Sequence, residues 1–216
     1  MIKIIEPSIK LLTPEIHIAG MAERIKYPGC VCYQSYETTS KTADEFIAML
    51  VGNDHLSVLE HESISVSIIC DRGVSHELVR HRLAAYSQES TRYCNYASKS
   101  MEFIKPCWFE PDWKPKKASD IDSYDIESIS ASDLWFLTMN ALSETYNTLI
   151  EKGYTPQQAR SVLPNSLKTE IVMTANLREW LHVFKLRTAP DAHPQMRQVM
   201  EMVKTEFKRL LPGIFI

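Results

Sequence analysis

The fold is decided by residues 63–69, which read SISVSII. Serine alternates there with isoleucine or valine, and a period of two is typical of a β-strand with one buried face. Upstream of this strand, Thr42 and Glu45 fit a capping box that predicts a helix as far as Val51. Far downstream, residues 168–174 carry β-branched side chains and are predicted to form a second strand.

Apolar spacing predicts that the C-terminal half of the chain is mainly helical. Capping and proline signals bound a short helix that opens at Thr155 and stops before Pro164. The other helices expected there cover residues 134–149, 176–187 and 196–210. Asn176 and Glu179 form a cap pattern at the start of the helix over residues 176–187. Together with the strand-bearing N-terminal half, this pattern predicts an α+β fold in which packed helices accompany a mixed or antiparallel sheet.

Length and composition indicate a compact protein without a membrane segment. Of 216 residues, 44% are hydrophobic, so we expect one domain over residues 1–216 with a real core. Residues 110–131 are rich in Asp, Ser, Lys and Pro and are expected to form a surface loop or insertion. The net charge of −3 argues against bulk affinity for nucleic acid or membranes. The five cysteines are read as reduced thiols, and the N-terminus lacks a signal peptide, so we expect a cytoplasmic protein.

The densest run of chemistry covers residues 80–93, which read RHRLAAYSQESTRY. Arginine presents a planar fork of donors that suits phosphate and carboxylate oxygens. Apolar spacing predicts a helix over residues 74–86, with Arg80 to Arg82 near its middle. A solvated helix face is the ordinary explanation for such a run, but apolar residues flank these cations, and an unpaired charge is costly there. We therefore expect a site for a polyanion.

The same run resembles a known signature. Arg-His-Arg at 80–82, a seven-residue spacer, Ser90 and then Arg92 are similar to the motif of the flavin-dependent thymidylate synthases. The resemblance extends to HLSVLEH at 55–61, which is similar to the H-x-[ST]-x-x-E-H segment of that family. It continues, in the family's order, through residues 159–164, 176–178, 186–187 and 191–193.

The resemblance implies an activity. Such a protein transfers a one-carbon unit from methylenetetrahydrofolate to deoxyuridylate (dUMP) and so makes thymidylate. The hydride comes from reduced FAD, which NADPH reduces again. The resemblance also implies a homotetramer whose active sites lie at subunit interfaces.

The resemblance further implies which residues meet the flavin. Ser57 corresponds to a contact with its phosphate end. The remaining flavin-side positions are Arg80, His81, Arg82, Gln88, Asn176, Leu177, Arg178 and His182.

A second set of positions corresponds to the dUMP pocket. These are Glu77, Leu78, Val79, Arg80, Gln88, Glu89, Ser90, Thr91, Arg92, Arg160 and Arg187. Arg187 is the predicted catalytic residue, because it matches the arginine that faces the uracil ring. A fixed cation beside O2 and N3 lowers the pKa of N3 and stabilises negative charge on the ring.

Several positions depart from the family pattern. Gln88 stands where many relatives have Glu, Glu77 where others have Gln, and His182 where Asn is frequent. Between Arg187 and His193 the chain is about two residues longer than the expected pattern. These departures concern individual contacts and leave the predicted activity unchanged.

The sequence gives little support to two other kinds of chemistry, a serine nucleophile and a metal site. Ser90 is a candidate nucleophile, but a hydroxyl that holds phosphate is the favoured reading, because a serine nucleophile needs an adjacent base. His55, His61 and His76 lack an accompanying H-E-x-x-H motif or cysteine–histidine ligand set, so no metal site is expected.

A different class of function stays open at this point. Three arginines and three tyrosines of the basic run and its surroundings could stack and clamp single-stranded nucleic acid, as in a nucleotide- or RNA-binding regulatory module. They are Arg80, Arg82, Arg92, Tyr86, Tyr93 and Tyr96. A structural homologue without turnover is a third reading, because of Glu77 and Gln88.

Overall fold

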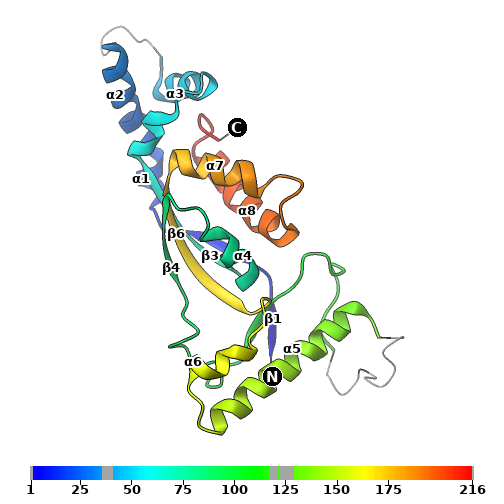
Figure 1. Ribbon diagram of the computed structural model, residues 1–216. Coiled ribbons are helices and arrows are strands. Elements are labelled where there is room, and N and C mark those ends of the chain that lie inside the picture. Colours follow the sequence, from blue (N-terminus) through cyan, green and yellow to red (C-terminus); the bar gives the residue numbers. More distant parts are fainter. Residues whose placement is uncertain (1, 36–40, 117–120, 122–128, 216) are drawn as a thin grey trace. The chain divides into compact units, whose positions relative to one another are not determined.

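The computed structural model describes residues 2–35, 41–116, 121 and 129–215 (Figure 1). The chain forms two compact units. The first unit comprises Met1–Pro7, Ile69–Glu77 and Gln88–Glu170, and the second comprises Ser8–Ile68, Leu78–Ser87 and Ile171–Ile216. The prediction of one domain over residues 1–216 stays a prediction.

The predicted strand at residues 63–69 is confirmed as β3 (Ser63–Asp71), and the strand predicted at 168–174 is confirmed as β6 (Lys168–Asn176). They are the inner strands of a four-stranded sheet with the order β2-β3-β6-β4. The outer strands are β2 (Ser8–Leu11) and β4 (Ala84–Gln88). Ile64, Val66 and Ile68 are fully buried, which explains the alternation in SISVSII.

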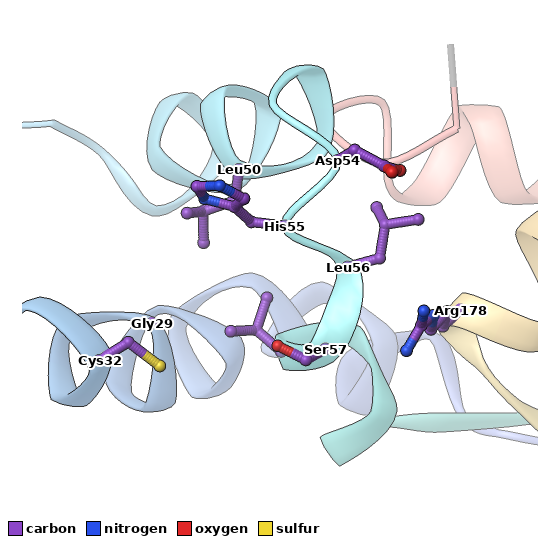
Figure 2. A pocket seen from close by; sticks show the side chains of 9 residues that line it. Gly29, Cys32, Leu50, Asp54, His55, Leu56, Ser57 and Arg178 are labelled. Atoms are coloured by element: carbon purple, nitrogen blue, oxygen red, sulfur yellow. The ribbon is translucent and has the colours of Figure 1, made fainter.

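The second unit holds most of the helices. They are α1 (Glu15–Ala19), α2 (Met21–Tyr33), α3 (Ala43–Gly52), the 3₁₀ segment η1 (Leu56–His61), α7 (Leu177–Arg187) and α8 (Pro194–Leu210). Figure 2 shows η1 close to α2 and to the C-terminal end of α3. Helices α7 and α8 pack through an aromatic cluster, in which the Trp180 and Phe207 ring centroids are 5.1 Å apart. Trp180 is fully buried, and its Nε1 donates to the carbonyl of Ile64 at 3.1 Å, which ties α7 to β3.

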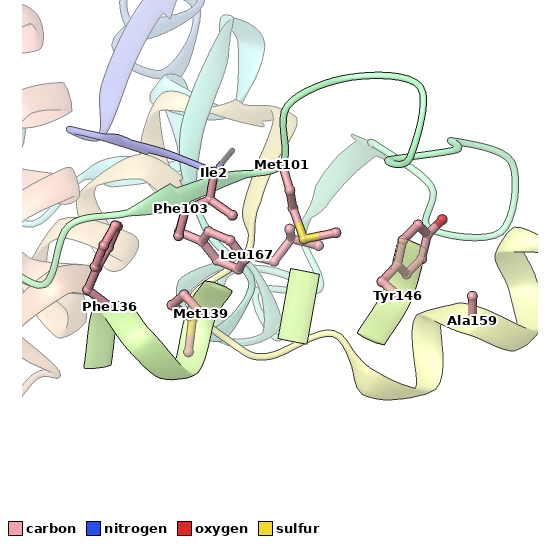
Figure 3. Packing of buried hydrophobic residues seen from close by; sticks show 8 residues of the cluster. All are labelled: Ile2, Met101, Phe103, Phe136, Met139, Tyr146, Ala159 and Leu167. Atoms are coloured by element: carbon pink, nitrogen blue, oxygen red, sulfur yellow. The ribbon is translucent and has the colours of Figure 1, made fainter. Parts of the chain in front are cut away.

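The first unit is built around a parallel pair of short strands and a long helix. Strand β1 (Lys3–Ile5) pairs with β5 (Glu102–Ile104), with Lys3 opposite Glu102. The helical elements are α4 (Arg72–Leu78), α5 (Ala131–Glu151), α6 (Pro156–Ala159) and the 3₁₀ segment η3 (Arg160–Val162). Figure 3 shows the core, where side chains of β5 and α5 such as Phe103 and Tyr146 are fully buried. The α+β prediction is confirmed, because a parallel pair, a four-stranded sheet and packed helices occur together.

The predicted helix starts are confirmed as local hydrogen bonds. In α3, the Glu45 amide donates to Thr42 Oγ1 at 3.3 Å, and the Thr42 amide donates to Glu45 Oε2 at 2.9 Å. At the start of α7, the Glu179 amide donates to Asn176 Oδ1 at 2.8 Å. These bonds satisfy backbone N–H groups that have no partner within the helix. Position 179 is therefore fixed by the first turn of α7.

The helix predicted over residues 74–86 is wrong. Helix α4 ends at Leu78, a turn follows, and β4 begins at Ala84. The hydroxyl of Tyr86 donates to the carbonyls of Leu78 and His81, at 2.6 and 2.9 Å. These hydrogen bonds satisfy one carbonyl at the end of α4 and one in the turn. The prediction counted Tyr86 as an apolar position of the helix and so did not anticipate them. Arg80 to Arg82 therefore lie in a turn rather than within a helix.

Two further predictions concern the surface. Of the loop expected at 110–131, residues 111–116 are mostly exposed, α5 already begins at Ala131, and residues 117–120 and 122–128 lie outside the described part. Within the described residues, we find no helix that is both long and apolar enough to cross a membrane.

Candidate active site

Two motifs that are far apart in the sequence meet in the second unit. The Nε–H group of Arg187, at the C-terminal end of α7, donates to Nε2 of His81 at 2.9 Å. The two residues are 106 positions apart, and His81 lies in the turn between α4 and β4. This turn separates the members of the Arg-His-Arg run, because Arg80 and Arg82 are exposed and His81 is only 5% exposed.

A buried carboxylate lies on the other side of His81. Oε1 of Glu179 is 3.5 Å from Nδ1 of His81, and both side chains are almost fully buried. The ring of His182 stands edge-on to His81, with the centroids 5.8 Å apart. Burial, and after it the charges of Arg187 and His182, together lower the pKa of His81 to about 4. His81 is therefore neutral near pH 7.

The ligand atoms of His81, Glu179 and His182 lie within 4.8 Å of one another, a spacing that a metal ion could use. Nε2 of His81 already accepts from Arg187, so a metal ion in this cluster would lie close to a fixed cation. The geometry therefore favours the hydrogen-bonded arrangement. The prediction that the protein has no metal site stays a prediction.

A pocket of about 490 Å³ opens beside this cluster. Its lining combines an exposed apolar side chain, Leu83, with polar groups of η1 and of the start of α7: Glu60, Asn176, Arg178, Glu179 and His182. Three of the predicted flavin-side residues, Asn176, Arg178 and His182, thus line one pocket. Leu83 is 74% exposed, so its apolar surface is accessible to a ligand in this pocket.

A second pocket, of about 380 Å³, also lies within the second unit (Figure 2). Ser57 of η1 and Arg178 of α7 line it, together with residues of α2, α3 and the segment between α3 and η1. Arg178 lines both pockets and forms an ion pair with Glu60, Nη1 to Oε1, at 2.5 Å. Since both partners are about half-exposed, this pair contributes little to stability, and Arg178 can serve a ligand.

The predicted dUMP residues of the first unit form a polar network. Nε2 of Gln88 donates to Ser75 Oγ at 2.8 Å and to Thr169 Oγ1 at 3.2 Å. Glu89 accepts from Lys168 Nζ and from Tyr96 Oη, both at 2.9 Å. Gln88 therefore contributes no charge here, and the charge of Glu89 is balanced by a lysine.

Arg160 of η3 contacts the segment that carries Ser90, Thr91 and Arg92. Arg160 Nη1 donates to Thr91 Oγ1 at 3.4 Å, and the Arg92 amide donates to Ser90 Oγ at 3.2 Å. The guanidinium of Arg92 stands 5.3 Å from the ring centroid of Tyr93. Because the Ser90 oxygen accepts from the backbone, its own O–H remains a donor, which suits an anion-binding role.

The other predicted positions differ in exposure. Val79 is exposed, Glu77 is half-buried, and Leu78 and Leu177 are fully buried. The backbone of Leu177 donates to the carbonyl of Glu62 at 3.0 Å. The side chains of these two leucines belong to the core, so only their backbone can face a ligand.

Sequence reasoning missed three residues that line the pocket in the second unit. Glu60 was the acidic position of the HLSVLEH segment, and Leu83 directly follows Arg82. The sequence identifies Glu179 only as part of a capping pattern, although its side chain faces His81. The available signal was the spacing of Glu179 and His182, three residues apart and thus neighbours on one helix face.

Comparisons with known proteins agree with these motifs. Residues 16–213 match the family model described as "Thymidylate synthase complementing protein". The chain is 30% identical over 208 residues to the flavin-dependent thymidylate synthase of Geobacter sulfurreducens, covering 94% of this chain and 81% of that protein. It is also 30% identical over 195 residues to the one of Mycobacterium tuberculosis (strain H37Rv), covering 88% and 77%.

Solved structures share the fold. The UMP/dUMP methylase PolB from Streptomyces cacaoi, bound with 5-Br UMP, superimposes with a TM-score of 0.71 at 20% identity, covering 99% of this chain and 94% of that one. The same enzyme with 5-Br dUMP gives 0.69 at 23% identity, covering 99% and 95%. With the family model matching most of its length, the chain belongs to the flavin-dependent thymidylate synthase family.

Proposed function

We propose that the protein converts dUMP to thymidylate, with methylenetetrahydrofolate as the carbon donor, FAD as the flavin and NADPH as the reductant. The observation that carries this proposal is the hydrogen bond from Arg187 to His81, because it joins the Arg-His-Arg motif to the C-terminal motif. The names of the relatives support the same reaction. The family membership gives no support to the alternative of a regulatory module that binds RNA.

The second unit fits a flavin dinucleotide. Its two pockets share Arg178, so their linings together offer a cation, the hydroxyl of Ser57, the amide of Asn176 and the apolar surface of Leu83. An elongated ligand with a charged pyrophosphate and a flat ring system needs these groups. In this proposal Ser57 and Arg178 hold the phosphates, and Leu83 with His182 borders the ring. When bound, the flavin supplies the hydride that completes the methyl group.

The first unit supplies groups for the nucleotide. Arg160, Arg92 and the hydroxyls of Ser90 and Thr91 are suited to the phosphate, because charge-assisted hydrogen bonds to phosphate are strong. Gln88 can present its amide oxygen as an acceptor, since its Nε2 is engaged by Ser75 and Thr169.

Arg187 performs the electrostatic step in this proposal. Its guanidinium stays protonated throughout, so it stabilises an anionic uracil ring without transferring a proton. The bond to His81 fixes the orientation of the guanidinium plane. A preorganised cation costs no reorganisation when the ring becomes charged, and this is the source of its contribution.

We also infer that the protein works as a homotetramer with shared sites. Family membership supports this proposal, and most soluble oligomers are symmetric, so several equivalent sites would lie at subunit contacts. Mixing a variant inactive through Arg160 with one inactive through Arg187 should restore part of the activity if subunits exchange. A monomeric mass by light scattering, with full activity, would contradict the shared site.

The decisive experiment is anaerobic turnover of the purified protein with FAD, NADPH, methylenetetrahydrofolate and dUMP. Thymidylate is identified by mass spectrometry, and each component is omitted in turn. The proposal expects thymidylate only when all four are present. If the protein binds flavin but forms no thymidylate, it is a flavoprotein with another activity and the proposed reaction is wrong. If the protein is colourless and binds RNA, the regulatory module is favoured.

A further inference from the structure

The carboxylate of Glu179 has no role in the function proposed above. Its side chain is buried, and its Oε1 lies 3.5 Å from Nδ1 of His81. The first turn of α7 holds the residue in place, because the Glu179 amide is capped by Asn176. A carboxylate is costly to bury unless it is paired or hydrogen-bonded, so its partner must be identified.

The two nitrogens of His81 meet different kinds of group. A guanidinium N–H can only donate, so at 2.9 Å from Arg187 Nε the Nε2 atom must offer its lone pair. The ring is neutral near pH 7, since its pKa is lowered to about 4 by burial and by the charges of Arg187 and His182. A neutral imidazole with a lone pair on Nε2 carries its proton on Nδ1, which is the side of Glu179.

We infer that Glu179 is a positioning residue: it holds His81 as the Nδ1–H tautomer, and His81 in turn fixes the guanidinium of Arg187. The kinetic consequence rests on the role proposed above for Arg187, whereas the tautomer does not. A ring released from Glu179 can carry its proton on Nε2, where an N–H would face the N–H of Arg187. Donor facing donor is repulsive, so the guanidinium would turn away. We call Glu179, His81 and Arg187 the positioning trio.

The first test reads the tautomer and needs no activity. Protein labelled with ¹⁵N-histidine is studied by NMR, and His81→Asn identifies the His81 signals. The expected result is the Nδ1–H tautomer in the wild type. Glu179→Gln should keep it, because the amide oxygen still accepts, whereas Glu179→Met, of similar volume, should yield a mixture or the Nε2–H form. A wild-type ring that is Nε2–H or doubly protonated overturns the inference, whatever the stability of the variants.

A matched control comes from the same unit. Glu62 is also largely buried, with 11% side-chain exposure, and pairs with Arg24 at 2.5 Å. Glu62→Met removes a comparable carboxylate and should leave the His81 tautomer unchanged. If Glu179→Met also leaves it unchanged, Glu179 does not hold the ring and the inference is wrong.

The second test separates positioning from an independent effect. Glu179→Met should lower kcat by about 10- to 100-fold, because part of the electrostatic contribution of Arg187 is lost when its guanidinium turns away. Glu179→Gln should recover most of that loss. In the Arg187→Ala background the same change should cost little more, because Glu179 acts through Arg187. An equal loss in both backgrounds contradicts the inference. If even the wild type makes no thymidylate, the proposed function fails, and the NMR result still decides the trio.

Discussion

Arg187 is the side chain on which the proposed chemistry most depends. Arg187→Ala should lower kcat by about 10²–10³, because removing one preorganised electrostatic contact costs roughly 2.7–4 kcal/mol. Arg187→Lys should retain only part of the wild-type kcat, because a compact ammonium group cannot reproduce the planar fork of donors that contacts His81. The measurement is turnover with saturating FAD and folate while dUMP is varied. Wild-type turnover in Arg187→Ala would exclude the catalytic role.

Ser90 should behave differently, because its hydroxyl is suited to hold an anion. Ser90→Ala should lose mainly dUMP affinity, by about 0.5–1.5 kcal/mol for a neutral hydrogen bond and up to about 3 for one to a charged phosphate. Thymidylate should still form, because no covalent serine adduct is proposed. Calorimetric titration with dUMP and product analysis check both points. If Ser90→Ala binds dUMP normally but forms no thymidylate, Ser90 acts as a nucleophile and the anion-binding role is wrong.

His81 should make the protein sensitive to acid. Its pKa is about 4 in the folded protein, against about 6.5 for an ordinary histidine, so the unfolded chain binds more protons between these values. The contribution of His81 to the free energy of unfolding is therefore fully present above about pH 6.5 and is lost as the pH falls toward 4. Urea denaturation at several pH values should show a weaker decline for His81→Asn than for the wild type. His76→Asn, at an exposed histidine, is the control and should follow the wild type.

At the scale of elements, the turn between α4 and β4 positions His81, and Tyr86 holds it. Tyr86→Phe removes the side-chain donor to the carbonyl of His81 and one of two donors to the carbonyl of Leu78, which also accepts from the His81 amide. The expected loss is therefore that of one neutral hydrogen bond, about 0.5–1.5 kcal/mol. We expect urea denaturation to show this loss. Tyr93→Phe is the control, because Tyr93 is 77% exposed and should change stability little. Equal stability of both variants would mean that the turn does not depend on the Tyr86 hydroxyl.

The same turn shows where sequence reasoning ends. The alternation of SISVSII and the capping pairs at Thr42 and Asn176 are local signals, and the structure confirms all three. The turn depends instead on a side chain further along the chain, because the hydroxyl of Tyr86 donates to the carbonyls of Leu78 and His81. The spacing of apolar residues does not predict such a hydrogen bond. Glu179 was hidden for a related reason, since its backbone serves the cap while its side chain serves His81.

For the whole molecule, flavin should stabilise the fold by mass action. At about 100 times its dissociation constant, a ligand that binds only the native state adds roughly 2.7 kcal/mol, so FAD should raise the unfolding temperature. Arg178→Ala should reduce this rise, because Arg178 lines both pockets of the second unit. Arg209→Ala, which removes an exposed ion pair with Glu15, is the control and should keep it. An unchanged temperature on adding FAD, with a colourless protein, would contradict the flavin proposal.

Arg178 also has a consequence for cofactor fragments. Because one side chain borders both pockets, an adenine-nucleotide fragment in one and a flavin mononucleotide in the other would draw on a single guanidinium, which Glu60 already engages. The two halves cannot each have it to the full extent. The sum of their separate binding free energies should therefore be larger than the binding free energy measured when both fragments are bound. Each fragment should lower the affinity of the protein for the other. The intact dinucleotide, with its two phosphates joined, satisfies Arg178 once, and this favours the whole cofactor over its parts.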